Sequence, residues 1–377
     1  MPTKKETCSL PHHGVASVGV PRVARDDKVL FRMPAEWEPH AATWIAWPHN
    51  ENDWPGKFEP IPWVYAEIVR HLARAEHVHI IIENAALEAK ARKVLKMADA
   101  PLDNVTFHRW RTNRVWTRDS GPIFVREVES RKQVALAWQF NAWAKYDDWK
   151  LDAKLPIHIG NKLGYTVVAP AAVGADDWAR RVVLEGGSID VNGCGSMLTT
   201  EECLLSETQQ RNPGVTREEL EFLFNLFLGV RKVIWLGNGI AGDDTHGHID
   251  DLARFVSKDT VVTVVEKDRG DVNYAPLQDN LKRLNRATDQ NGKRLNVVEL
   301  PMPAPVIFEG RRLPASYANF YIANGLVLVP TFNDPNDRVA LSTMASLFPK
   351  RKVVGIHCGD FIWGFGALHC MTQQEPR

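Results

Sequence analysis

The chain has 377 residues, of which 44% are hydrophobic and 24% are charged, the ordinary balance of a globular protein with a large core. Lysine and arginine together number 46, and aspartate and glutamate also number 46, so the bulk charge gives no attraction to nucleic acid or to an anionic membrane. No apolar run approaches the roughly 18 residues of a spanning helix, so no membrane partner is expected.

Cysteine usage indicates a reducing compartment. The chain has five cysteines, an odd number that makes a poor disulfide framework. They are Cys8, Cys194, Cys203, Cys358 and Cys370. Residues 11–14 interrupt anything like the apolar core of a signal peptide, so we expect a cytoplasmic protein. Residues 1–30 lack periodicity and are expected to be an N-terminal extension, and residues 31–377 a single domain.

The first predicted elements are a strand at residues 43–48, a helix at about 60–74 and a strand at 77–82. A helix at 86–97 and a strand at 105–110 follow. After them the chain becomes repetitive, with hairpin-like segments that begin at Ile123, Ser188, Ala253 and Phe320 and are separated by 65, 65 and 67 residues.

A helix-like stretch and a further β-rich run follow each hairpin, which makes a ββαβ module. The predicted helices cover residues 148–163, 216–228, 275–284 and 335–348. Residues 367–373 supply one more first strand, and with the start of the chain they would complete a fifth module and close a ring. The alternative is that a mixed α/β chain shows a loose period by chance.

Polar residues before the first strand of each module follow the same spacing. Asp119 and Glu185 are 66 residues apart, and Glu185 and Asp250 are 65 apart, with His248 beside Asp250. If the modules are related by rotation about one axis, these side chains converge in one pocket. Taken singly, each could be a helix cap or a surface residue.

Cys370 is the candidate nucleophile. It lies in the predicted last strand, seven residues from the C-terminus, so the closing module would bring it to the same pocket. A cysteine with an imidazole and two carboxylates supplies a nucleophile, a base and cation-binding groups. Without those partners, a buried and unreactive thiol would be the default interpretation.

A second His-Cys pair, His357-Cys358, falls at the end of a third strand, outside this set. Side chains that are adjacent in a strand point to opposite faces, so His369 is not expected to be the catalytic partner of Cys370. Cys194 lies in a hairpin turn, and Cys203 is interpreted as structural.

Several motifs then occur in a familiar order. They are MPAEWEPHAATWIAWP, VWTRDSGPIFV, LEGGSIDVNG with LTTEECLL and RNPG, GHIDDLARF, ASYANFYIANG and LHCMTQQEP. Together they resemble the agmatine deiminase / bacterial peptidylarginine deiminase family of the guanidine-modifying (pentein) superfamily, from about Met33 to Pro376.

The resemblance implies a five-bladed α/β propeller of pseudo-fivefold ββαβ modules, and it assigns roles to residues. Cys370 matches the nucleophile and His248 the general acid/base. Asp119 and Asp250 match the carboxylates that hold the guanidinium. The remaining matches, at pocket positions, are Glu185 and Trp116.

The implied reaction needs no metal or organic cofactor and takes a small cationic guanidino substrate. With agmatine it proceeds through a covalent thiouronium to N-carbamoylputrescine and ammonia, a step toward putrescine and other polyamines. A peptidylarginine deiminase producing citrulline is the alternative. The run Gly364–His369, GFGALH, departs from the Gly-Gly-Gly-Asn-Ile-His of agmatine deiminases, which affects distal substrate contacts more than the chemistry.

Two rival functions come from other features. The sequence DTHGHID at residues 244–250 contains His-x-His with flanking acids, which a metal-dependent amidohydrolase could use. The altered run before Cys370 would also fit a non-catalytic binder of guanidino ligands.

Substrate preference is predicted from the charge of the motif segments. They are acidic or aromatic, and Arg118 is expected to turn away from the pocket, so agmatine should be preferred to free arginine. The tryptophans at 44, 47 and 54 could cover the pocket, pack in the core or form a homo-oligomeric interface, with core packing as the default.

Overall fold

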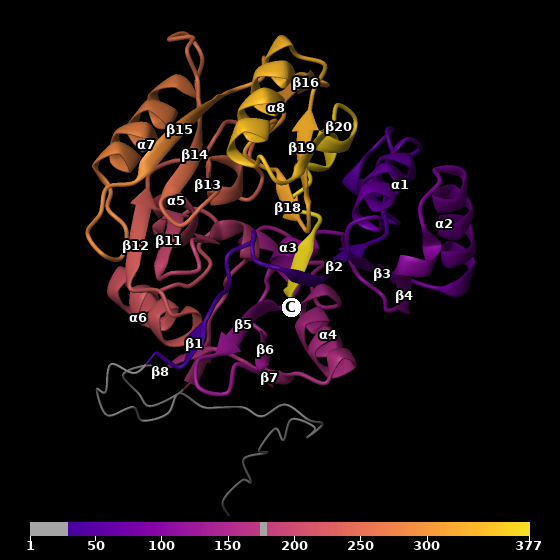
Figure 1. Cartoon of the computed structure of the whole chain (residues 1–377), viewed down its shortest axis with the longest axis horizontal. Coiled ribbons are helices and arrows are strands. Elements are labelled where there is room, and N and C mark those ends of the chain that lie inside the picture. Colours follow the sequence, from indigo (N-terminus) through magenta and orange to yellow (C-terminus); the bar gives the residue numbers. More distant parts are fainter. Residues whose placement is uncertain (1–28, 174–178) are drawn as a thin grey trace, which may run out of the picture.

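The computed structural model describes residues 29–173 and 179–377. Its described residues form five sheets of three or four strands, which follow one another around the molecule, and two small two-stranded sheets (Figure 1). In each of the five larger sheets two strands pair antiparallel, and the second of them pairs parallel with a third. Parallel neighbours need a long crossover, which a helix supplies here. The molecule is therefore the five-bladed α/β propeller of ββαβ modules that the repeat and the resemblance predict.

Four modules are continuous in sequence. Their strands are β5 (Ile123–Glu127), β6 (Gln133–Leu136) and β7 (Thr166–Val168); β10 (Asp190–Val191), β11 (Ser196–Thr200) and β12 (Lys232–Leu236); β13 (Ala253–Phe255), β14 (Thr260–Val265) and β15 (Asn296–Pro301); and β18 (Tyr321–Ala323), β19 (Leu326–Thr331) and β20 (Lys352–His357). The middle strands β14 and β19 each have five buried residues out of six, as expected for strands covered on both faces.

Helices join the second and third strands of each module. They are α4 (Leu155–Leu163), α5 (Glu201–Leu205) and α6 (Arg217–Leu228), α7 (Tyr274–Arg286), and α8 (Pro335–Leu347). The helix predicted for 148–163 begins later than expected, because the single turn η4 (Asp152–Lys154) occupies the start of that range; a further turn, η3 (Ala142–Ala144), lies before it. A capping box of Thr216 and Glu219 starts α6, and Gly229 ends it with a φ of 71°.

The fifth module joins the two ends of the described chain, as predicted. Strand β21 (Gln373–Pro376) pairs antiparallel with β2 (His40–Ala46), which continues into β3 (His77–Ile82) and β4 (Val105–Arg109). Its helices are α1 (Ile61–Leu72) and α2 (Ala85–Met97). A short β1 (Phe31–Arg32) extends the sheet of β5.

The remaining elements are small. They are the hairpins β8 (Ala171–Val173) with β9 (Ala179–Arg181) and β16 (Ile307–Phe308) with β17 (Arg311–Arg312), and the turns η1 (Glu51–Asp53), η2 (Leu102–Asn104) and η7 (Phe361–Gly364). Trp44 and Trp54 are fully buried, so the default of core packing is confirmed for them. No helix in the described part of the chain is long and apolar enough to cross a bilayer.

One predicted position is wrong and one lies outside the described residues. Cys370 is not in a strand but in a turn just before β21, because Thr372 Oγ1 donates to the Leu368 carbonyl (2.8 Å) and the Cys370 carbonyl accepts from the Arg118 amide (3.2 Å). The extension predicted for residues 1–30 lies outside the described residues except for its last two positions.

Candidate active site

Short turns at the start of three modules carry the acidic and imidazole side chains. The turns are α3 (Thr117–Ser120), η5 (Gly186–Ser188) and η6 (Ile249–Asp251). Asp119 lies in the first, Glu185 immediately before the second, and Asp250 in the third, directly after His248. Because each turn leads into the first strand of its own module, the propeller places side chains from distant parts of the sequence side by side.

The five polar residues predicted from the sequence lie together and are all at most 5% exposed. Cys370 Sγ is 3.6 Å from Asp250 Oδ2. His248 Nδ1 is 3.9 Å from Asp119 Oδ1 and 4.0 Å from Asp250 Oδ1. On the other side of the ring, His248 Nε2 is 3.6 Å from Glu185 Oε2.

A cavity of about 260 Å³ reaches this cluster. Its inner wall includes Asp119, Cys370 and the indoles of Trp116 and Trp143. Trp116, predicted from the sequence as a pocket residue, therefore lines the cavity. An aromatic wall around a carboxylate is a suitable environment for a planar cation.

Asp119 is held by both of its oxygens. Oδ1 accepts from the Gly187 amide (2.9 Å) and Oδ2 from Trp143 Nε1 (2.9 Å). Trp143 is presented by an unusual turn in which residues 142–144 have φ of 49°, 59° and 52°. None of the three is glycine, so this left-handed turn costs on the order of 1 kcal/mol per residue and is maintained by its surroundings.

Asp250 is held from behind by a chain of buried groups. His369 Nδ1 is 2.7 Å from Asp250 Oδ2, and His369 Nε2 is 2.8 Å from Glu36 Oε2. The same Glu36 oxygen accepts from Arg254 Nη2 (2.7 Å). His369 and Cys370 thus contact the same oxygen of Asp250, and His369, held by Glu36, orients that carboxylate.

Asn319 is a neighbour of the sulfur that the sequence analysis missed. Its Nδ2 lies 3.1 Å from Cys370 Sγ, and its Oδ1 accepts from the His369 amide (3.0 Å). A signal was present, because Asn319 stands immediately before Phe320, the start of the fourth hairpin, as the acids stand before the other hairpins.

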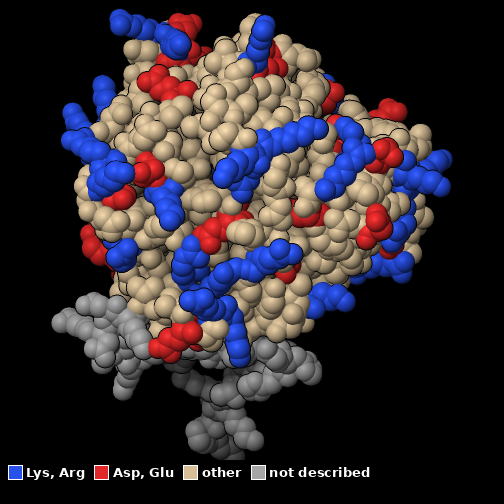
Figure 2. All heavy atoms as spheres, in the orientation of Figure 1, with Lys and Arg blue, Asp and Glu red and all other residues tan. Residues whose placement is uncertain are grey.

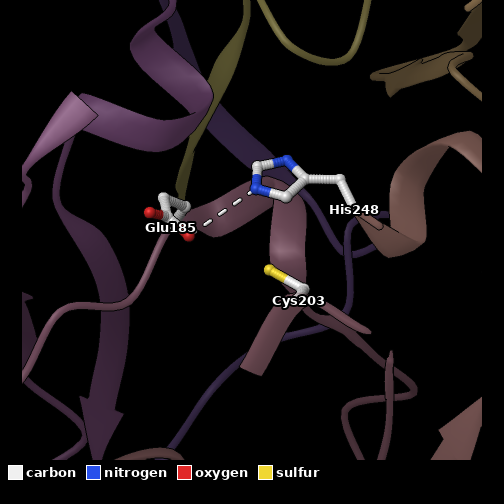
Figure 3. Close-up of side chains that lie close together, drawn as sticks. All are labelled: Glu185, Cys203 and His248. Carbon is white, nitrogen blue, oxygen red and sulfur yellow. Dashed lines mark ion pairs between the residues drawn. The ribbon is translucent and has the colours of Figure 1, made fainter. Parts of the chain in front are cut away.

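Glu185 has its own buried partner. Its Oε1 accepts from Arg211 Nε (3.1 Å), and neither side chain is exposed to solvent. Arg211 belongs to the RNPG motif, and nothing in its spacing indicated this contact. Cys203 was interpreted as structural, but its sulfur lies within 4.8 Å of ligand atoms of both Glu185 and His248 (Figure 3).

The electrostatics make His248 cationic. Burial lowers its pKa, but the charge of Asp119 and the side-chain interactions with Cys203 and Glu185 outweigh burial and raise the pKa well above its ordinary value. Burial opposes ionisation of Glu185, but Arg211 and His248 lower its pKa to about 2. Burial and the charges of Asp250 and Glu185 raise the pKa of Asp119 to about 6, against the opposing effect of His248.

The pKa values of Cys370 and Asp250 are shifted in opposite directions. Burial and the charges of Asp250, Asp251 and Asp119 raise the pKa of the Cys370 thiol well above its usual range. Burial would raise the pKa of Asp250 as well, but the hydrogen bond from His369 and the charge of His248 bring it below its ordinary value. At neutral pH the free site therefore holds a protonated thiol beside an ionised Asp250.

The competing residues do not join this cluster. Cys358 is buried apart from the cavity wall, and burial raises the pKa of its thiol far above the usual range. His246 Nδ1 lies 3.7 Å from Glu202 Oε1, whereas His248 faces Glu185, so the two histidines of His-x-His do not converge on one point. Asp244 binds Lys145 Nζ (2.6 Å) instead.

The outer wall of the cavity contains a cation that the sequence analysis missed. Arg114 lines the cavity, where its guanidinium pairs with Asp53 Oδ1 (2.5 Å) and Asp148 Oδ1 (3.1 Å) and packs 4.2 Å from the Tyr146 ring centroid. Arg118 is turned away, as expected, and its Nη1 donates to Gln374 Oε1 (2.6 Å). The acidic or aromatic motif segments thus do not describe the whole cavity, because Arg114, immediately before VWTRDSGPIFV, also lines it.

Comparison with known proteins places the chain in a family. The model of the Porphyromonas-type peptidyl-arginine deiminase family matches residues 32–376. The agmatine deiminase of Pseudomonas aeruginosa (strain LESB58) is 34% identical over 371 residues, covering 92% of this chain and 95% of its own.

Solved structures agree with this result. The agmatine deiminase of Enterococcus faecalis has a TM-score of 0.83 at 31% identity, covering 92% of this chain and 96% of its own. The agmatine deiminase of C. jejuni with substrate bound has a TM-score of 0.81 at 31% identity, covering 92% and 97%. Sequence and fold agree over nearly the whole described chain: it belongs to the Porphyromonas-type peptidyl-arginine deiminase family, and it is a deiminase-type hydrolase.

Proposed function

We propose that this chain hydrolyses the guanidinium group of agmatine to N-carbamoylputrescine and ammonia, with Cys370 as the nucleophile and no metal or organic cofactor. The observation that carries the proposal is the buried cluster in which the Cys370 sulfur lies 3.6 Å from Asp250 Oδ2, with His248 Nδ1 4.0 Å from Asp250 Oδ1. The 34% identity to an agmatine deiminase over 92% of the chain supports agmatine as the substrate.

Binding begins with charge pairing. Asp119 and Asp250 accept hydrogen bonds from the nitrogens of the planar guanidinium, which fixes its orientation beside the sulfur. Trp116 and Trp143 line the same part of the cavity and offer π faces to the cation. The incoming positive charge also favours the thiolate of Cys370, which the surrounding carboxylates disfavour in the free protein.

The first half-reaction breaks a carbon–nitrogen bond. Binding of the guanidinium favours ionisation of the Cys370 thiol, whose proton leaves to solvent, and the thiolate attacks the guanidinium carbon. Asp250, which lies 3.6 Å from Sγ, stays ionised and keeps its hold on the guanidinium. In the tetrahedral adduct a C–S bond has formed. His248, which is cationic in the free site, gives a proton to one nitrogen, ammonia leaves, and a thiouronium remains on Cys370.

The second half-reaction restores the enzyme. Neutral His248 takes a proton from water, whose oxygen attacks the thiouronium carbon. Collapse of this adduct breaks the C–S bond, releases the ureido product and transfers the hydroxyl proton to the departing thiolate. The balance is one guanidinium and one water consumed, and one ureido product, one ammonia and one proton released, the proton being the one that the thiol gave up when the substrate bound. Glu185 keeps its negative charge beside His248 Nε2 and stabilises the imidazolium.

A colorimetric ureido assay on agmatine, free arginine and an arginine peptide tests the proposed function. We expect kcat/KM for agmatine to exceed that for arginine by at least about tenfold, on the order of 1.4 kcal/mol of discrimination. Comparable values for agmatine and arginine, or a preference for the peptide, would overturn the choice of agmatine and leave the deiminase chemistry standing.

Arg114 favours a second candidate, a guanidino substrate with a distal carboxylate, such as arginine, whose product would be citrulline. The cation stands in the cavity wall that the distal end of a substrate would reach. Asp53 and Asp148 already compensate its charge, which is why agmatine remains the first choice. The variant Arg114→Gln separates the two: it should lower kcat/KM for arginine at least about tenfold only if Arg114 binds the carboxylate.

We further propose that the protein acts in the cytoplasm, in putrescine and polyamine biosynthesis, as one domain over residues 31–377 that assembles into a homo-oligomer. Figure 2 shows positive and negative side chains interspersed over the visible face, which supports the expectation of no nucleic-acid or membrane partner. Size-exclusion chromatography with light scattering tests the oligomeric state.

A further inference from the structure

Behind the imidazole of His248, on the side opposite Asp119, lies a second group of side chains. Cys203 extends from α5, and its sulfur, a Glu185 carboxylate oxygen and a His248 ring nitrogen all lie within 4.8 Å of one another. Figure 3 shows the three side chains converging, with Glu185 and His248 joined as an ion pair. All three are buried.

The polar atoms of this group are not satisfied within the protein. Neither ring nitrogen of His248 has a hydrogen-bond partner among the described residues, and neither does Glu185 Oε2. Buried polar atoms are ordinarily paired, so each exception needs an explanation. Catalysis accounts for His248 Nδ1, which faces Asp119 and Asp250. On the other side, the 3.6 Å ion pair of His248 Nε2 with Glu185 Oε2 is too long for a hydrogen bond, and catalysis gives no role to the Cys203 thiol that meets the two.

We propose that Glu185, Cys203 and His248 form a binding site for a thiophilic divalent cation such as Zn²⁺ or Cd²⁺, and that the cation inhibits the enzyme when bound. Imidazole, carboxylate and thiolate are the three ligand types that zinc takes, at about 2.0–2.1, 2.0–2.2 and 2.3 Å. Tetrahedral ligand atoms at those distances are roughly 3.3–3.6 Å apart. The Nε2-to-Oε2 distance is already 3.6 Å, so closing the site needs only a small rotation of the side chains.

The surroundings support a cation at this point. Arg211 occupies Glu185 Oε1 and so leaves Oε2 directed at the site, as second-shell partners of metal ligands do. The positive charge of Arg211 opposes binding, but the carboxylates of Asp119 and Asp250, which face the same imidazole, give the cluster an excess of negative charge.

Inhibition follows from the proposed function, because a cation on Nε2 replaces the Nε2 proton, and His248 could then give its Nδ1 proton to departing ammonia only by becoming an imidazolate, which is a much weaker acid step than the loss of a proton from imidazolium. Binding itself does not depend on that function. The two claims can therefore fail separately, provided that binding is followed by its own signal.

The experiment titrates the full-length, metal-free protein with Cd²⁺ and follows the ultraviolet charge-transfer band of a cadmium–thiolate bond. We expect one Cd²⁺ per chain in the wild type and in Cys194→Ser, the matched control, whose cysteine lies in a hairpin turn outside the cavity. Cys203→Ser should lose the band, and Cys370→Ser should keep it. In ureido assays, Zn²⁺ should need at least about tenfold more metal to halve the rate of Cys203→Ser than that of the wild type, each relative to its own metal-free rate.

Two results would overturn the proposal. The first is a wild type without the band. The second is a band that survives in Cys203→Ser and disappears in Cys370→Ser, which would place the metal on the nucleophile. Circular dichroism of each variant confirms that a lost band is not lost folding. If the band behaves as expected but no substrate gives a ureido product, the proposed function fails and the metal site stands.

Discussion

Asp119 and Asp250 lie in one buried cluster but differ in how they are held. Asp250 receives a hydrogen bond from His369, which is itself held by Glu36, and its pKa is lowered. Asp119 receives one backbone amide and one indole, and burial leaves its pKa at about 6. Asp250 should therefore stay ionised where Asp119 begins to take up a proton. The acid limb of the pH profile should belong to Asp119.

The first prediction concerns that limb. A protonated Asp119 cannot hold a guanidinium, so kcat/KM should fall as the pH drops through about 6. Trp143→Phe removes a donor to the carboxylate, raises the pKa of Asp119 and should move the limb upward by about 0.5–1 pH unit. Trp138→Phe is the control, since this buried indole lies away from the cavity and has no hydrogen bond among the described residues. An unmoved limb in Trp143→Phe would contradict the assignment.

The roles of single residues could be predicted from the sequence only where their spacing along the repeat placed them in the pocket. Asp119, Glu185 and Asp250 share a spacing, so they could be found. Glu36, Arg211 and Cys203 reach the site through folding contacts that no spacing records. The motif segments are acidic or aromatic, but Arg114, which stands outside them and two residues before Trp116, also lines the cavity.

At the scale of elements, the turn η5 is the tightest part of the site. A Cβ on Gly187 would lie 2.6 Å from His248 Nδ1, 2.8 Å from Asp119 Oδ1 and 3.0 Å from Asp250 Oδ2. Real Cβ contacts are not that short, so any side chain here forces the turn or the catalytic groups to move. The glycines of LEGGS thus serve the packing of functional groups rather than a special backbone angle.

Gly187→Ala should therefore lower kcat/KM at least about hundredfold, since a displacement of about 1 Å in a catalytic group has that effect. The thermal midpoint should fall much less than the activity does. Gly270→Ala is the matched control, because its Cβ would meet only the flexible Asp268 side chain, at 3.3 Å. Full activity in Gly187→Ala would mean that the three groups need not hold the observed geometry.

The elements themselves were predictable because their patterns are local. Hairpins such as β13–β14 and helices such as α8 follow from apolar runs, turn residues and caps. The turn that contains Cys370 could not be predicted in the same way, because residues 367–373 have the composition of a strand. Contacts with the distant Arg118 amide and with Thr372 fold the chain at Cys370 into a turn before β21.

At the scale of the whole molecule, ring closure makes the site. Strand β21 pairs with β2, so residues from the two ends of the described chain share one sheet, and Cys370 is held just before that sheet. The repeat predicted this closure, since the first part of the chain lacks the first strand of a module and the last part supplies only that strand. The identity of the substrate depends on side chains at the cavity rim, which lie outside the repeat.

A chelator tests the expectation that no cofactor is needed. The reaction proposed for Cys370 and His248 has no Lewis acid, so exhaustive dialysis against a chelator should not lower the rate on agmatine. Removal of an inhibitory metal from the Cys203 site would raise the rate on agmatine. Loss of activity that zinc restores would favour the amidohydrolase alternative instead.

The most direct test of the central claim is ureido release from agmatine by the wild type, Cys370→Ser and Cys358→Ser under identical conditions. Both variants replace one buried sulfur by oxygen, so general effects of the substitution are matched. The account predicts no detectable turnover in Cys370→Ser and most of the wild-type rate in Cys358→Ser. An active Cys370→Ser together with an inactive Cys358→Ser would contradict it.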